Sequence, residues 1–497
     1  MRVLKLVVII FSLITFKNGF SQSLTAYRIG VDAEASTIIS SGSVTPFWLR
    51  SNQYGTVPTR APAAVLQARV FREYWSYDSS LTHRKKFDWG FVVNPMVAWD
   101  KQQQAKFLLP EAHVKLRFRQ VEVYAGRRKE LIGIGDSTLS SGFFAGSGNA
   151  LPIPKIQIAT IGYVPLAFTG KFIAVNAAFA HGWINTPPYL EGARLHQKHL
   201  YFKFGKPSHR VKVYFGINHQ VQWAGHSEYL KKHPELALNG QLPASWEFFP
   251  NVVFAYTPAN WDKKSGYTSY DSYRLGNHLG SYDAGIEANV RGRKLLIYHQ
   301  HPYEDFSSLA FKNAPDGLWG FNYAINVDRY KPWGFKLTRL TAEFLTTKSQ
   351  TGPTFYIPGS KYQGGDNYFN HGQYTEGWSY FGRTIGTPFI APRNDMIISV
   401  PEGGNFFPNN RINMWYTGAQ FIYREDVLLT VRTSYSRNFG IAGVVRDPVI
   451  GQFSGLLSCQ IPVPDWLYTY VSLKIGIDSG DLFKNSVAGS IGVRKSW

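Results

Sequence analysis

The sequence predicts an all-β fold: a transmembrane antiparallel β-barrel of the outer membrane, with about 18 strands and long extracellular loops that partly fill the lumen. Segments of about ten residues with alternating apolar and polar side chains recur along the whole chain. After the N-terminal segment, no apolar run is long enough to span a bilayer as a helix. The chain also carries an export signal, and an exported sheet that spans a membrane must close its edges.

Residues 1–21 have the pattern of a secretory signal peptide. Arg2 and Lys5 form the basic region, and residues 6–16 form the apolar region. Residues 19–21 supply a small-x-small cleavage site, and no Cys follows it, which argues against a lipoprotein anchor. The predicted location is therefore the outer membrane, reached through a cleaved signal.

The composition of the chain suits strands and turns. Its 497 residues include 29 Tyr, 35 Phe, 14 Trp and 46 Gly but only 4 Met. The single cysteine, Cys459, excludes an intramolecular disulfide and any multi-Cys metal site. It lies in an apolar strand segment, where an inert wall residue is expected.

A hairpin over residues 109–128 shows the pattern most clearly. In its first strand three apolar residues alternate with three basic ones, Val114, Leu116 and Phe118 with Lys115, Arg117 and Arg119. So many cations do not fit the core of a soluble sandwich, but they fit a water-filled lumen whose outer face meets lipid. The basic residues expected to face the lumen are Lys115, Arg117, Arg119, Lys212 and Arg432.

The same periodicity places strands along the entire mature chain. The predicted ranges are 24–37, 62–76, 85–99, 106–118, 121–128, 155–163, 170–181, 197–205, 210–222, 280–290, 293–301, 318–327, 334–346, 412–423, 427–437, 452–462, 466–478 and 485–497. Residues 22–497 are thus expected to form one barrel domain. The apolar run Val252 to Tyr256 is left out because bacterial barrels have even strand numbers, and it is expected to form a short helix in a loop.

Connection lengths predict which end of the barrel faces outward. Short connections alternate with long ones, and outer-membrane barrels have short periplasmic turns and longer extracellular loops. The connections 100–105 and 479–484 are shorter than expected for outer loops. The largest predicted outer loops are 129–154, 223–279 and 347–411.

The final strand and the net charge indicate partners. An alternating strand that ends on Trp497 has the form of a signal read by barrel-assembly machinery, and Trp497 also suits the aromatic belt at the membrane surface. The formal net charge of +20 favours an acidic polysaccharide or lipopolysaccharide phosphate as partner, and it is equally typical of a wet lumen lined by Lys and Arg. An exported chain is not expected to bind nucleic acid.

No sequence motif predicts catalysis, a metal site or a cofactor. The chain has neither H-E-x-x-H nor G-x-S-x-G. Asp136, Ser137 and Ser140 share a loop that a His could approach, but scattered Ser, His and Asp residues carry almost no specificity for a triad. The adjacent Glu304 and Asp305 do not have the spacing of a glycosidase pair. The sequence is interpreted as non-enzymatic.

The large loops combine aromatic residues with polar ones. Trp378 and Tyr380 lie close to Arg383, and sugar rings stack on aromatic faces while Arg bridges hydroxyls and carboxylates. This pattern favours polysaccharide binding. Packing of loop against loop over the barrel mouth is the alternative for each of these residues and the more common use of such side chains.

The chain resembles the capsule-assembly outer-membrane proteins of the Wzi family, in the branch found in Bacteroidetes-like bacteria. The resemblance covers most of the mature chain and depends on a few motifs: Pro46 to Gly55, Ala125-Gly126-Arg127, the loop positions Gly135, Ser137, Leu139, Ser140, Asn149, Pro152 and Pro154, the segment Gly276 to Ser281, and His371 to Gly386. It implies an eighteen-stranded barrel that acts as a surface lectin for capsular polysaccharide. Enterobacterial members carry a longer N-terminal helical bundle that plugs the barrel, whereas here only a short segment separates the signal from the first strand.

The predicted function is therefore binding of surface polysaccharide in support of capsule or exopolysaccharide assembly or attachment. The alternative is a diffusion porin or a glycan uptake channel. The predicted polysaccharide contacts are Gly133, Asp136, Ser137, Asn149, Trp378, Tyr380 and Arg383. The other expected partners are outer-membrane lipid, lipopolysaccharide and the barrel-assembly machinery.

Overall fold

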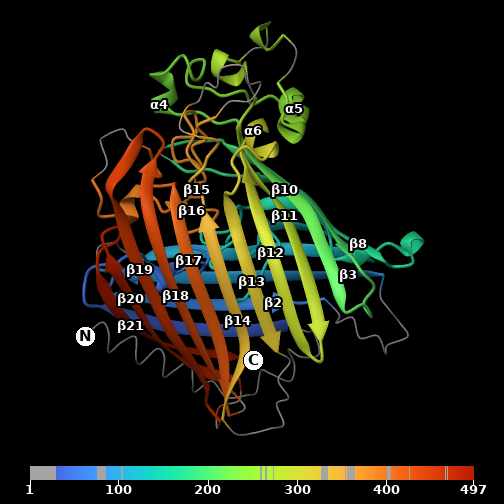
Figure 1. The fold of residues 1–497 in the computed structure, drawn as a ribbon, viewed down its shortest axis with the longest axis vertical. Helices are drawn as coiled ribbons and strands as arrows, with labels where there is room; N and C mark the ends of the chain where they lie inside the picture. Colours follow the sequence, from blue (N-terminus) through green and yellow to red (C-terminus); the bar gives the residue numbers. More distant parts are fainter. Residues whose placement is uncertain are drawn as a thin grey trace.

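The alternating segments form the strands of one closed antiparallel barrel (Figure 1). The computed structural model describes residues 29–74, 86–101, 105–187, 189–257, 260–263, 266–272, 274–325, 334–352, 354, 364–399, 405–424, 426–464, 466 and 468–497. The predicted signal peptide lies outside these residues. Within them, eighteen strands form the wall: β1 Ile29–Ser40, β2 Ala63–Arg72, β3 Phe87–Asp100, β4 Lys106–Phe118, β5 Val121–Arg127, β6 Lys155–Thr160, β8 Ile173–Trp183, β9 Arg194–Phe204, β10 Val211–Trp223, β11 Asn277–Val290, β12 Arg293–Tyr303, β13 Gly317–Ile325, β14 Phe335–Thr346, β17 Ile412–Tyr423, β18 Val427–Ile441, β19 Val444–Pro462, β20 Thr469–Gly480 and β21 Ser486–Ser496.

The first and last strands close the sheet. β1 pairs with β2 on one side and with β21 on the other, both antiparallel. Trp497 extends the pairing of β1 with β21, since its backbone N–H donates to Val31 O at 2.8 Å. Each predicted strand range overlaps one observed strand, and the prediction of an eighteen-stranded barrel is confirmed. A role of the last strand as an assembly signal stays a prediction.

Side-chain alternation gives the wall an apolar outer face and a polar inner face. On β4 the outward residues Val114, Leu116 and Phe118 are 55%, 45% and 57% exposed, whereas Lys115 and Arg117 are 6% and 8% exposed. Apolar side chains exposed to this extent, in rows around the wall, are stable in lipid and not in water. The wall is therefore the membrane-spanning surface. In the described part of the chain, no helix has the length and apolar character needed to cross a membrane.

The two ends of the barrel differ in connection length. Tight turns join β4 to β5, β11 to β12 and β17 to β18, and the four longest connections, 41–62, 128–154, 224–276 and 347–411, emerge at the opposite end, which is the extracellular end. Arg119 does not face the lumen as the alternation predicts. It occupies the exposed turn between β4 and β5 with φ 54°, where the chain reverses, and so does not continue the lumen-facing row of β4.

The extracellular loops contain the remaining elements. Their helices are α3 Phe47–Arg50, α4 Glu228–Lys231, α5 Phe249–Phe254 and α6 Phe306–Leu309, with short 3-10 turns η3 Trp246–Phe248, η4 Trp261–Lys263, η5 Ser269–Ser272 and η6 Arg393–Asp395 and a small hairpin of β15 Ser379–Tyr380 and β16 Arg383–Thr384. At the opposite end, β7 Val164–Pro165 and η2 Ala167–Thr169 lie in the connection from β6 to β8. Figure 1 shows α4, α5 and α6 beyond one end of the strands. A short helix is observed where one was expected in the run Val252 to Tyr256, but α5 begins earlier, at Phe249, and ends at Phe254.

The main hydrophobic core lies inside the barrel, where loops meet the inner wall. Its largest members come from three loops and include Trp48, Phe144, Phe369 and Trp378, all at most 1% exposed. They pack against inner-row side chains such as Tyr416 of β17. Full burial of one such ring contributes about 1.5–3 kcal/mol, so this core holds the loops within the lumen.

Candidate extracellular binding cleft

Residues 129–154, which connect β5 to β6, fold inward and cross the lumen; we call this segment the crossing loop. Side chains from the walls hold its backbone. The contacts are Ile134 N to Asp283 Oδ2 at 3.0 Å, Ser141 N to Glu343 Oε2 at 2.6 Å, Phe144 N to Gln300 Oε1 at 2.8 Å, Gln220 Nε2 to Ala145 O at 2.8 Å, Arg432 NH2 to Thr138 O at 2.8 Å and Tyr416 Oη to Leu139 O at 2.5 Å. These side chains come from six strands, so the loop is tied to much of the inner wall.

Glycines let the crossing loop lie this close to the wall. Gly133 has φ 144°, and a Cβ there would lie 2.7 Å from Gln300 Nε2. Gly142 has φ 122°, and a Cβ there would lie 2.7 Å from Pro388. Side chains at either position would meet both a disfavoured backbone conformation and a steric clash. Gly133, one of the predicted polysaccharide contacts, therefore permits loop packing.

Asp136 is the strongest tether of the crossing loop. Its carboxylate accepts hydrogen bonds from Asn322 Nδ2 at 2.6 Å, Thr341 Oγ1 at 2.9 Å and its own loop's Thr138 N at 2.9 Å. It also forms an ion pair with Arg339 at 2.6 Å. With its oxygens so occupied and only 4% of its surface exposed, Asp136 positions the loop and does not offer a free carboxylate to a sugar.

Two further predicted contacts in this loop differ in exposure. Asn149 is buried; its Oδ1 accepts from Asn52 N at 3.2 Å and its Nδ2 donates to Thr384 O at 3.2 Å. It thus joins three loops. Ser137 is exposed and lines a lumenal cavity of about 110 Å³ together with Arg432.

The predicted aromatic contacts Trp378 and Tyr380 are core residues. Trp378 is 0% exposed, and Tyr380 packs in a second hydrophobic cluster while its hydroxyl accepts from Arg127 NH2 at 3.1 Å. Neither ring can be reached by a sugar, which corrects the expectation of a stacking platform at these two positions. The next residue, Phe381, has φ 49° at the tip of the β15–β16 hairpin and is 57% exposed.

Phe381 and Arg383 line a cleft of about 880 Å³ at the extracellular end. We call it the extracellular cleft. Its walls come from the β1–β2 connection, the adjoining ends of β3 and β4, the β15–β16 hairpin, η6 and the β20–β21 connection. The charged residues that line it are the cations Arg50, Arg60, Lys106, Arg383 and Lys484 and the carboxylates Asp100, Asp395 and Asp478. The lining is therefore basic.

Arg383 braces the floor of the cleft. It is buried, donates from NH2 to Val57 O at 2.9 Å and lies 4.0 Å from Asp395 Oδ2. Asp395 in turn pairs with Arg50 at 2.5 Å. Burial lowers the pKa of Arg383 to about 10, and the nearby Arg50 charge acts in the same direction. Burial alone would raise the pKa of Asp395, but the Arg50 and Arg383 guanidiniums outweigh it and hold that pKa below its usual value. Arg383 and Asp395 are therefore both charged at neutral pH.

Two other cations of the cleft are free to meet a ligand. Arg60 and Lys106 form no ion pair among the described residues, and Lys106 is exposed. Lys484, also exposed, donates only to Ser43 Oγ at 3.2 Å. Together with the ring of Phe381, the cleft thus presents positive charge beside an apolar face.

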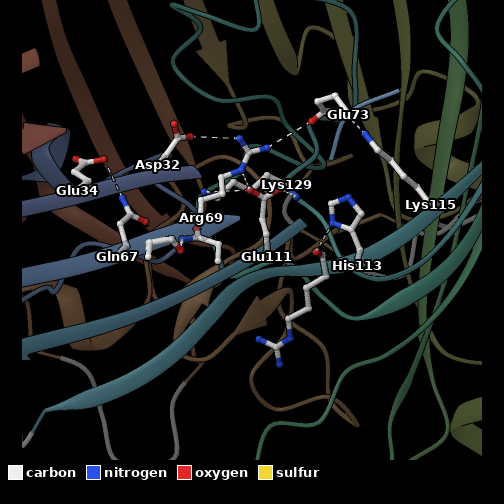
Figure 2. Close-up of polar contacts among 12 residues, drawn as sticks. Asp32, Glu34, Gln67, Arg69, Glu73, Glu111, His113, Lys115 and Lys129 are labelled. Atoms are coloured by element: carbon white, nitrogen blue, oxygen red, sulfur yellow. Dashed lines mark hydrogen bonds and ion pairs between the residues drawn. The ribbon is translucent and has the colours of Figure 1, made fainter. Parts of the chain in front are cut away.

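The predicted lumenal cations are mostly neutralised by neighbours. Lys115 bonds Glu73, Arg117 lies 3.7 Å from Asp88, and Lys212 lies 3.4 Å from Glu287. Figure 2 shows the continuation of this network: Arg69 lies between Asp32 and Glu111, each at 3.6 Å, and Lys129 approaches Glu111 at 3.7 Å. Several of these side chains line a lumenal cavity of about 260 Å³. These lumenal cations have carboxylate partners, whereas Arg60 and Lys106 of the extracellular cleft have none among the described residues.

Most residues of the cleft are not predicted from the sequence. Arg50 lies in the segment Pro46 to Gly55, which was noted for its resemblance but given no binding role, and Arg60 and Lys106 carried no signal because they are remote in sequence from the aromatic loop. Within the described residues, no group of three or more His, Cys, Asp and Glu side chains could hold a metal ion.

Comparison with known proteins identifies the fold. No protein-family model and no curated protein matches the sequence. Among solved structures, the chain is similar to Escherichia coli Wzi, an outer-membrane protein involved in group 1 capsule assembly and a carbohydrate-binding β-barrel, with a TM-score of 0.58, 13% identity, and coverage of 95% of this chain and 86% of that one. Pseudomonas aeruginosa OccK5 and Acinetobacter baumannii OccAB4 each match with a TM-score of 0.44 at 7% and 8% identity, covering 94% of this chain and 97% of theirs. The likeness to Wzi shows a shared fold, and the chain is an outer-membrane β-barrel.

Proposed function

We propose that this barrel binds an acidic surface polysaccharide in the extracellular cleft and supports capsule or exopolysaccharide attachment or assembly, without catalysing a reaction. The observation that carries the proposal is that two cations without an ion pair among the described residues, Arg60 and Lys106, share one cleft of about 880 Å³ with the exposed ring of Phe381.

The chemistry of the cleft suits an acidic glycan. Sugar carboxylates pair with Arg60 and Lys106, and the apolar face of a sugar ring packs on Phe381. Arg383 and Asp395 keep the cleft wall in place and are positioning residues. The carbohydrate binding and capsule assembly described for Wzi, which shares the fold, agree with this proposal.

The crossing loop favours a binding protein over a wide diffusion channel. A general porin needs an unobstructed aqueous lumen. Here the loop crosses the lumen, and side chains of six strands bond its backbone. The core around it inside the barrel is rich in aromatic rings. These contacts favour a surface binding protein over a diffusion porin or glycan uptake channel.

Equilibrium binding of an acidic polysaccharide to the purified barrel tests the proposal. The probe is the anionic surface polysaccharide of the producing cells, compared with its carboxyl-reduced form. We expect the double variant Arg60→Gln/Lys106→Gln to bind about tenfold more weakly, because each ion pair near solvent contributes up to about 1 kcal/mol. Phe381→Ser should weaken binding of both forms.

Arg119→Gln is the control: it removes one positive charge, against two in the double variant, from an exposed turn at the opposite end of the barrel. Unchanged affinity in the double variant, or equal loss in Arg119→Gln, would contradict the proposal. So would equal binding of the native and the carboxyl-reduced polysaccharide.

A further inference from the structure

The lipid-facing row of β8, β9 and β10 changes character along its length. At the periplasmic end the outward side chains are apolar, among them Phe202, Phe204 and Phe215. At the extracellular end the same row contains two cations. Arg194 stands in register between Trp183 and Trp223, and Lys198 between Phe179 and His219. Cations are costly in a lipid-facing row unless they reach the headgroups or a specific partner.

Both cations hold an extracellular segment against the outside of the wall. Arg194 donates from NH1 to Ala244 O at 2.8 Å, and its guanidinium lies 4.7 Å from the ring of Trp223 and 4.9 Å from that of Trp246. Lys198 Nζ donates to Val253 O and lies 5.5 Å from the ring of Phe254. The segment 244–254, with η3 and α5, therefore rests on the membrane-facing side of the rim.

The charges of these two cations are not neutralised by the protein. Within the described residues neither Arg194 nor Lys198 forms an ion pair, and both remain partly exposed. Backbone carbonyls satisfy hydrogen bonds but bring no negative charge. Two positive charges at the level of the outer-leaflet headgroups favour binding of an anionic membrane lipid.

The aromatic surroundings extend the lipid-facing surface. Trp246 is 56% exposed and Phe254 is 73% exposed, and both lie beside the cations. Exposed aromatic rings next to basic side chains are typical of the boundary between the hydrocarbon and the headgroups. Below them, Phe179 and Leu200 continue the exposed apolar wall along which acyl chains would run.

We infer that the outer wall at the extracellular ends of β8–β10, together with the segment 244–254, is a binding site for a phosphorylated glycolipid of the outer leaflet. One phosphate lies at Lys198 and a second at Arg194, the headgroup sugar lies against Trp246 and Phe254, and the acyl chains lie along Phe179 and Leu200. Charge complementarity and continuity with the lipid-facing wall select this occupant. The site lies outside the barrel, is separate from the extracellular cleft, and does not depend on the proposed function.

Native mass spectrometry of the full-length barrel in detergent tests the site, with lipid A carrying its phosphates as the probe and dephosphorylated lipid A as the comparison. We expect wild type to retain the phosphorylated form preferentially and Lys198→Gln to bind it about fivefold more weakly, the change expected for one basic residue at an anionic membrane surface. Lys198→Arg, which keeps the charge, should restore binding.

Lys206→Gln is the control, because it removes one charge from the exposed turn at the other end of β9 and β10. The inference fails if wild type binds the two lipids equally, or if Lys198→Gln and Lys198→Arg both bind as wild type does. It also fails if Lys206→Gln lowers binding as much as Lys198→Gln. Loss of binding in both Lys198 variants would likewise refute it, because it would show that the charge is not what the lipid recognises.

Discussion

Several carboxyl groups of the extracellular loops are buried together. Asp366 accepts a hydrogen bond from Thr351 Oγ1 at 2.9 Å, and Asp305 accepts from Ser307 N at 2.8 Å. Burial raises the pKa of Asp366 to about 7, and the neighbouring Asp305 carboxylate adds to this shift. Burial likewise raises the pKa of Glu304, which accepts from Phe369 N at 2.9 Å, to about 8.

These carboxyl groups predict that the loop core loses stability as pH rises. An unfolded Asp ionises near pH 4 and the folded Asp366 near pH 7, so between these values the folded loop binds more protons and its unfolding free energy falls with increasing pH. Hydrogen exchange of peptides covering residues 304–316 and 364–370, corrected for intrinsic rates, should show easier opening at pH 8 than at pH 5. Asp366→Asn should reduce this difference and the exposed control Asp262→Asn should not. Equal opening free energies at the two pH values would refute the assignment.

At the scale of elements, the crossing loop decides whether the barrel conducts. Wall side chains of six strands bond its backbone, and Asp136 adds a buried ion pair to Arg339. Tyr54, from the β1–β2 connection, donates from its backbone N–H to Gly148 O at 2.7 Å and lines three separate lumenal cavities. The lumen is thus divided by this loop and the side chain that packs on it.

Removal of the crossing loop should open the barrel. We expect small single-channel conductance for wild type in planar bilayers and a severalfold increase when residues 133–148 are replaced by a short Gly-Ser linker. Asp136→Asn is a milder variant that releases one tether and should give intermittent openings. Lys231→Gln, an exposed position on α4 beyond the ends of the strands, is the control and should leave conductance unchanged. A large conductance in wild type would favour the porin alternative.

At the scale of the molecule, the barrel wall was predictable from sequence and the site largely was not. Strand alternation is a local pattern set by lipid on one face and water on the other, so rows such as Val114 to Phe118 could be placed without knowledge of their neighbours. Arg119 broke the pattern because a turn begins there. The expected filling of the lumen by loops is observed.

The site failed to follow from sequence because loop burial depends on distant contacts. Tyr380 and Phe381 are adjacent aromatic residues, yet the first is buried and the second is exposed. Tyr380 pairs with Arg383 across the hairpin, and Phe381 lies in the turn between them. Asp136 and Trp378 have residue types that suit sugar binding, but they tether and fill the interior. Arg60 precedes β2 and Lys106 begins β4, so the two meet through the pairing of both strands with β3, and they meet Phe381 only where the distant loop 347–411 folds against them.

If the extracellular cleft holds surface polysaccharide, the cleft cations should decide how much of it stays on the cell. The most direct measurement is the amount of polysaccharide retained on cells that lack this protein and are complemented with wild type, Arg60→Gln/Lys106→Gln or Arg119→Gln at equal outer-membrane levels. We expect wild type and Arg119→Gln to restore retention, and we expect cells with the cleft double variant to release polysaccharide into the medium. Normal retention in cells without the protein, or full restoration by the double variant, would contradict it.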